Sequence, residues 1–94
     1  MIIKKKADVM HFLENFDYFT KTEGLKSYFA FDWYHNGTIT LIQYPNNSFS
    51  YHRKCDLFWD IKEISPELKE LKKLVWENRK FVNKAIKKAK CLTT

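Results

Sequence analysis

The sequence predicts an α+β fold, in which a three-stranded antiparallel meander packs against an N-terminal amphipathic helix and a long basic C-terminal helix. Apolar residues recur at helical spacing near both ends of the chain and alternate with polar residues in the middle. The 94 residues include two glycines and two prolines, which favours regular elements joined by short connections. The length and the even composition predict one compact domain over residues 1–94.

Residues 8–22 fit an amphipathic helix. Five apolar side chains recur three or four positions apart and so share one helical face. They are Val9, Phe12, Leu13, Phe16 and Phe19. Asp8 suits the N-cap, because its carboxylate accepts hydrogen bonds from free amides of the first turn. Gly24 suits the left-handed position that follows a helix.

Residues 27–53 fit three antiparallel strands. Aromatic residues alternate along the first strand, and Asn36-Gly37 is typical of a type I′ turn, which needs positive φ at both central residues. A two-residue loop pairs Trp33 with Thr40, Phe31 with Ile42 and Phe29 with Tyr44. These six side chains form the face that we expect to pack against the helices. The third strand is expected at residues 48–53.

The last third of the chain is predicted to be helical. Residues 56–64 fit a short helix somewhat better than a strand. Ser65-Pro66-Glu67 is typical of a helix start, with serine at the N-cap and proline at the first helical position. We therefore expect one continuous helix over residues 66–94, with its apolar stripe toward the core and its lysines on the opposite side.

The net charge of the chain lies within that C-terminal segment. Residues 66–94 contain nine Lys or Arg and three Glu, whereas residues 1–65 contain eight basic and eight acidic side chains. The formal charge of +6 therefore comes from the C-terminal helix alone. Charge that is segregated in this way predicts a surface that meets an anionic partner.

Trp76 lies among the cations of this predicted helix. Bases stack on an indole ring while phosphates meet lysines, so the pattern predicts binding to nucleic acid or to a nucleic-acid-bound complex. An acidic protein surface is the alternative partner, and a solvated basic face with Trp76 in the core is the alternative without a ligand. The predicted binding residues are Lys69, Lys72, Lys73, Trp76, Arg79, Lys80, Lys84 and Lys87.

A second functional class is a protein inhibitor or adaptor that blocks a host enzyme. Exposed aromatic side chains are strong interface anchors, and the candidate anchors are Tyr34, Tyr44, Tyr51 and Trp59. Small single-domain chains of this kind are typical of phages and mobile elements, which use both regulators and inhibitors. The apolar stripe of the C-terminal helix also fits a heptad pattern with Asn78 at a core position, so a homodimer is a further alternative.

The sequence shows no motif for catalysis, a cofactor or a metal, so we expect a non-enzymatic protein without a cofactor. Two glycines do not make a phosphate-binding loop, and His52 with Cys55 supplies half of a zinc site. Cys55 and Cys91 form no disulfide pattern, which predicts a reducing, cytoplasmic setting. No apolar run approaches the ~20 residues of a membrane span, so we expect no membrane partner.

Overall fold

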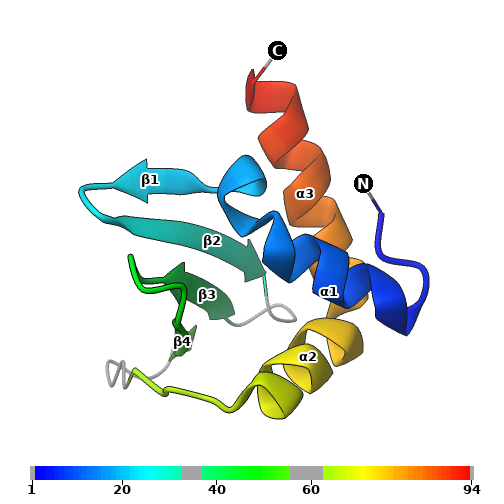
Figure 1. Cartoon of the computed structure of the whole chain (residues 1–94). Coiled ribbons are helices and arrows are strands. Elements are labelled where there is room, and N and C mark those ends of the chain that lie inside the picture. The colour runs from blue at the N-terminus through cyan, green and yellow to red at the C-terminus, as the bar shows by residue number, and fades with distance from the viewer. Residues whose placement is uncertain (1, 33–36, 56–62, 94) are drawn as a thin grey trace.

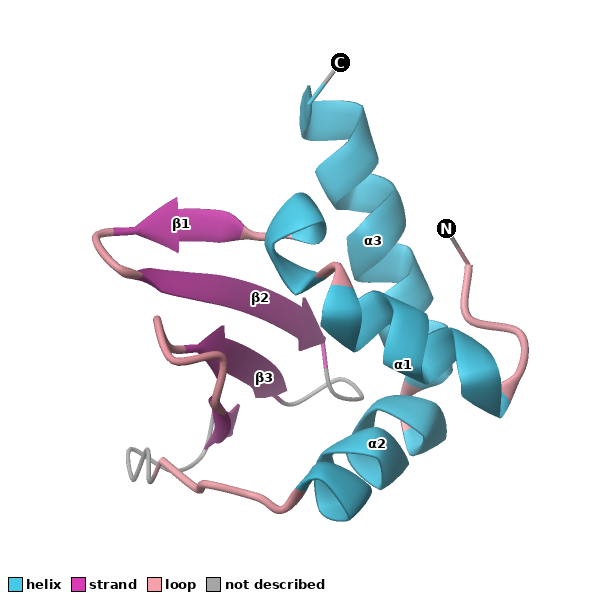
Figure 2. Cartoon of the chain, viewed as in Figure 1, coloured by secondary structure: helices cyan, strands magenta, loops and turns pink. Residues whose placement is uncertain are grey.

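A computed structural model describes residues 2–32, 37–55 and 63–93 and confirms the α+β fold (Figure 1). The elements follow in the order α1 (Lys6–Glu14), the 3-10 helix η1 (Phe16–Phe19), β1 (Lys21–Glu23), β2 (Lys26–Asp32), β3 (Gly37–Gln43), β4 (Phe49–Cys55), α2 (Leu68–Glu77) and α3 (Arg79–Thr93). The strands form one antiparallel sheet in the order β1-β2-β3-β4, so the predicted meander corresponds to β2–β4 and gains β1 at its edge. The helices pack against one face of this sheet (Figure 2).

The N-terminal helix is shorter than the predicted 8–22 helix, because Asn15 ends it. The backbone N–H and the side-chain Nδ2 of Asn15 both donate to the carbonyl oxygen of His11, at 3.1 and 2.9 Å. α1 therefore stops at Glu14, and the chain continues as η1 and then as the extended strand β1. The short polar side chain competes with the helical hydrogen bonds, which is why asparagine favours helix ends.

The two residues expected to cap this helix have other positions. Asp8 is the third helical residue rather than the N-cap, and its Oδ2 accepts from the backbone N–H groups of Lys4 and Lys5 at 2.9 and 3.0 Å. These hydrogen bonds hold the pKa of the Asp8 carboxyl below its ordinary value. Gly24, at φ 63°, begins the two-residue turn Gly24-Leu25 between β1 and β2, where a hairpin needs positive φ.

The register of β2 against β3 differs by three residues from the predicted one. Phe31 lies opposite Ile39, and Phe29 lies opposite Leu41. An odd shift moves the partner side chains to the other face of a sheet. Ile39 and Leu41 are consequently buried in the core, whereas Thr40 lies on the opposite face and is half-buried. Three residues of the predicted hairpin lie outside the described part of the chain: Trp33, Tyr34 and Asn36.

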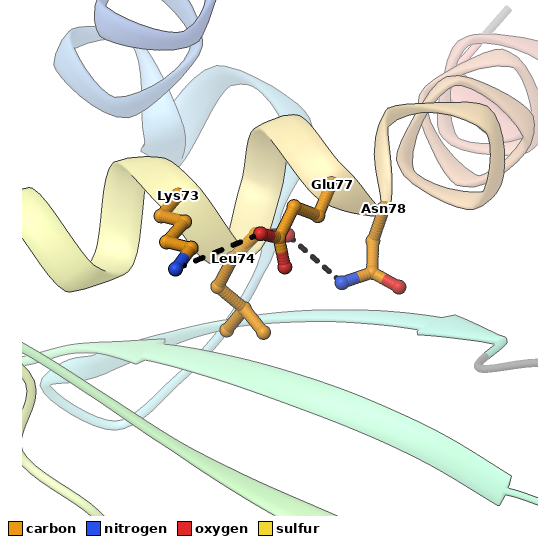
Figure 3. A network of polar contacts seen from close by, with 4 residues as sticks. All are labelled: Lys73, Leu74, Glu77 and Asn78. Carbon is orange, nitrogen blue, oxygen red and sulfur yellow. Dashed lines mark hydrogen bonds and ion pairs between the residues drawn. The ribbon is translucent and has the colours of Figure 1, made fainter.

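The predicted continuous C-terminal helix is two helices, because Asn78 interrupts it. The side-chain Nδ2 of Asn78 donates to the Leu74 carbonyl at 2.9 Å, and its backbone N–H donates to the same oxygen at 3.2 Å (Figure 3). The Asn78 carbonyl accepts from the N–H groups of Phe81 and Val82 at 2.9 and 3.0 Å. One asparagine thus ends α2 and starts α3. α2 itself begins at Leu68, two residues after the predicted start.

Aromatic rings form the centre of the core. The Phe12 ring lies 5.0 Å from the Phe29 ring, 5.9 Å from the Phe16 ring and 5.8 Å from the Phe19 ring, measured between centroids. The C-terminal helices complete this cluster with four fully buried side chains: Leu71, Val75, Val82 and Ile86. Packing within one chain therefore accounts for the heptad-like spacing, and a homodimer through this stripe is not supported.

β4 confirms the strand predicted at residues 48–53 and extends to Cys55. On its outer side, Ile64 pairs with Tyr51 through two backbone hydrogen bonds of 2.8 and 2.9 Å. Residues 56–62 lie outside the described part of the chain, and with them most of the helix predicted at 56–64.

Candidate nucleic-acid interface

The break at Asn78 divides charge unevenly between the two C-terminal helices. α2 and the preceding Glu67 contain three lysines and three glutamates, whereas α3 contains six cations and no acidic residue. The formal charge of the chain, +6, therefore equals the charge of α3. The α3 cations are Arg79, Lys80, Lys84, Lys87, Lys88 and Lys90.

Four exposed lysines of α3 share one side of the helix; we call Lys80, Lys84, Lys87 and Lys88 the lysine face. At ~100° per residue they cover an arc of about 100°, and at ~1.5 Å per residue they extend along about 12 Å of the helix. The buried Val82 and Ile86 occupy the opposite side. The burial of these two side chains therefore determines that the lysines point to solvent.

The orientation of α3 is fixed on a second side by the N-terminal segment. The Oδ1 of Asn83 accepts from the N–H of Ile3 at 2.8 Å, and its Nδ2 donates to the Ile3 carbonyl at 3.1 Å. α3 also packs against β2 and η1. These contacts oppose rotation of α3 and keep the lysine face outward.

The lysines of α2 lie among acidic residues. Lys69 and Lys73 are exposed and Lys72 is half-buried, and the same helix includes Glu70 and Glu77. The Nζ of Lys73 lies 3.9 Å from the Oε1 of Glu77, between side chains that are 75% and 58% exposed (Figure 3). A solvated pair of this kind adds little stability, but it lowers the positive potential around α2.

Trp76 is half-buried and packs against the hydrophobic core. The guanidinium carbon of Arg79 lies over its ring, 4.2 Å from the centroid, and Arg79 Nη1 donates to the Trp76 carbonyl at 3.0 Å. Arg79 thus joins the end of α2 to the start of α3 across the break. A base that stacked on this face of the indole would have to displace Arg79.

The structure therefore divides the eight predicted binding residues into two groups. It brings Lys80, Lys84 and Lys87 together on the lysine face, and it places the other five on α2 or at the junction. Lys88 was missing from the prediction, because on a helical wheel it borders the apolar stripe beside Phe81. Phe81 is half-buried, so Lys88 reaches solvent next to it.

The described aromatic anchors of the alternative protein interface already have contacts within the chain. Tyr44 is half-buried; its hydroxyl donates to Glu63, and the Nζ of Lys26 lies 4.9 Å from the centroid of its ring. Tyr51 is half-buried and packs against the core. The other two anchors, Tyr34 and Trp59, lie outside the described residues.

Glu63 is a polar centre that sequence reasoning did not single out. Its Oε1 accepts from the hydroxyl of Ser50, a buried residue of β4, and from the hydroxyl of Tyr44. These two hydrogen bonds hold the pKa of the Glu63 carboxyl below its ordinary value, with Ser50 the larger cause. The arrangement fastens the segment before α2 to the sheet and has a structural role.

Other kinds of site find little support in the described residues. Within residues 2–32, 37–55 and 63–93, no three His, Cys, Asp or Glu side chains gather closely enough to hold a metal ion. No helix in the same part of the chain is long and apolar enough to cross a membrane. A groove of about 450 Å³ lies between the β3–β4 turn and the start of α2, but it has no charged lining residue and does not extend the basic surface.

Comparisons with protein-family models, with curated proteins and with solved structures found no match to this chain. The functional argument therefore depends on the geometry and charge of the C-terminal helices.

Proposed function

We propose that this is a small non-enzymatic binding protein whose lysine face contacts the phosphates of nucleic acid, either free or in a nucleic-acid-bound complex. The observation that carries the proposal is the charge of α3, which has six cations, no acidic residue and four lysines on one exposed side. Lysines that neutralise phosphates release condensed counterions, which is the main source of sequence-independent affinity. The proposal places the protein in the cytoplasm, as a regulator of the kind that phages and mobile elements use.

The contact belongs on α3 rather than around Trp76. The indole ring is half-buried and one of its faces carries Arg79, whereas every lysine of the lysine face is exposed. The α2 lysines share their helix with two glutamates, so their field partly cancels. An anionic strand is therefore attracted more strongly to α3 than to α2.

Two double variants with the same net charge test this assignment. Lys84→Gln/Lys87→Gln removes two charges from the lysine face, and Lys69→Gln/Lys73→Gln removes two exposed charges from α2. Binding of a labelled DNA duplex is followed by fluorescence anisotropy over a range of salt concentrations. The α3 variant should lower the log–log salt slope by roughly 1.4–1.8, since each lost phosphate contact removes about 0.7–0.9. The α2 variant should lower it by less than half of that amount.

The outcomes separate three explanations. Equal losses in the two variants would show that net charge, and not the lysine face, determines binding. Absence of binding by the unmodified protein at low salt would overturn the proposal. Capture of a nuclease-resistant partner from a host lysate by both the unmodified protein and the α3 variant would instead favour the protein-inhibitor class.

A further inference from the structure

The side chains that could read a base sequence are few on α3. Recognition in the major groove relies on paired hydrogen bonds from arginine, asparagine or glutamine to base edges. α3 contains one arginine, one asparagine and no glutamine or acidic residue. Its specificity therefore depends on whether Arg79 and Asn83 are available.

Both of these side chains are engaged within the protein. Asn83 uses its Oδ1 and its Nδ2 on the backbone of Ile3, which are the two atoms that would pair with adenine. Arg79 donates to the Trp76 carbonyl and stacks on the indole. The lysine face that remains presents compact, mobile charges on long stems, which suit phosphates better than base edges.

A platform for unpaired bases is also missing from the described part of this surface. Proteins that bind single strands stack bases on exposed aromatic rings. Trp76 and Phe81, the aromatic residues of α2 and α3, are half-buried, and Arg79 lies over the Trp76 ring. A duplex, whose bases are already stacked, needs no such platform.

The lysines form two rows along α3. Lys80 and Lys87 lie about 20° apart around the helix, and Lys84 and Lys88 lie about 40° apart on the neighbouring strip. The C-terminal turns of α3 extend beyond the sheet and the other helices (Figure 1). A helix about 10–12 Å wide fits the B-form major groove, of about 12 Å, and two rows of lysines suit the phosphates of its two walls. The deep, narrow major groove of A-form RNA does not admit it.

On the basis of the proposed function, we infer that α3 binds the backbone of duplex DNA without reading its sequence. The test measures anisotropy with duplexes of equal length: mixed sequence, A·T only and G·C only, together with the mixed sequence as a single strand and as an RNA duplex. The three DNA duplexes should bind within roughly threefold of one another, because each wrong base pair in a specific site weakens binding roughly five- to hundredfold. The single strand and the RNA duplex should bind more weakly than any of the DNA duplexes.

Two variants make the inference falsifiable. Lys84→Gln should weaken binding to all three DNA duplexes by the same factor. Asn83→Ala, checked by circular dichroism to be folded, should leave affinity for each duplex within twofold of the unmodified protein. A preference of more than tenfold for one duplex, or stronger binding to RNA or single strands, would overturn the inference while leaving phosphate binding intact. Failure to bind any nucleic acid would instead remove the proposed function.

Discussion

Asn83 pairs with Ile3 as a neighbouring strand would, with its amide oxygen accepting from the Ile3 N–H and its amide nitrogen donating to the Ile3 carbonyl. The contact joins residues that are 80 positions apart, and Ile3 is 2% exposed. The lysines that follow Ile3 therefore belong to a docked segment rather than to a free basic arm. α3 is in turn held by a part of the chain that precedes every other element.

Replacement of Asn83 by alanine should detach this segment. The change removes two hydrogen bonds and leaves partly buried backbone groups of Ile3 without partners, so we expect a loss of about 1–3 kcal/mol in the free energy of unfolding. Chemical denaturation measures the loss, and hydrogen exchange should show rapid exchange of the Ile3 amide in the variant. An Ile3 amide that stays protected in Asn83→Ala would contradict the pairing.

The sheet register can be tested with neighbouring residues of β3. Ile39→Ala should cost about 2–5 kcal/mol, because it opens a cavity beside Phe31 in the core. Thr40→Ala, on the other face, should cost less than about 1 kcal/mol, as expected for a site outside the core. The register expected from a two-residue Asn36-Gly37 loop makes the opposite prediction, so a larger loss at Thr40 would support it.

Glu63 should make the stability depend on pH in the acid range. The hydroxyls of Ser50 and Tyr44 favour its ionised form, so its pKa in the folded protein lies below the ordinary 4.5. Its contribution is present above pH 4.5 and is lost as the pH falls through the lowered value. The unfolding free energy of Glu63→Gln should therefore fall less steeply than that of the unmodified protein below pH 4.5. Tyr44→Phe, which removes one donor, should lie between the two curves.

Trp76 reports on the junction between α2 and α3 once Trp33 and Trp59 are replaced by phenylalanine. Its emission should lie between those of buried and solvated indoles and should not change when single-stranded DNA is added. Arg79→Ala should increase acrylamide quenching of Trp76 and destabilise the protein by about 0.5–1 kcal/mol, as expected for an exposed cation–π contact. Strong quenching by single-stranded DNA would show instead that bases stack on the indole, as the sequence pattern suggested.

The fold was predictable wherever burial follows a simple period. Val9, Phe12 and Leu13 identify α1 by their spacing, and Phe29 with Phe31 identifies β2. The register was wrong because the prediction relied on the local preference of Asn36-Gly37. The alternative pairing buries Ile39 and Leu41 beside the phenylalanines, and this gain in the core outweighs the turn signal.

The candidate site was predictable in composition but not in geometry. Counting charges located the basic residues, yet a single helical wheel placed Trp76 at their centre. The wheel assumes an unbroken helix, and Asn78 fitted it as a polar residue at a heptad core position. The side chain of Asn78 instead bonds the Leu74 carbonyl, and a pattern of residue types does not distinguish these two uses of asparagine.

Separation of the acidic residues from α3 has a further consequence for that helix. Lys80, Lys84 and Lys88 follow one another at intervals of four, and each such pair of like charges disfavours a helix by roughly 0.2–0.5 kcal/mol. No carboxylate of α3 offsets this repulsion, so the helix depends on the burial of Val82 and Ile86 for its order. An anion along the lysine face would relieve the repulsion, and ligand binding and helix formation would then be two parts of one equilibrium.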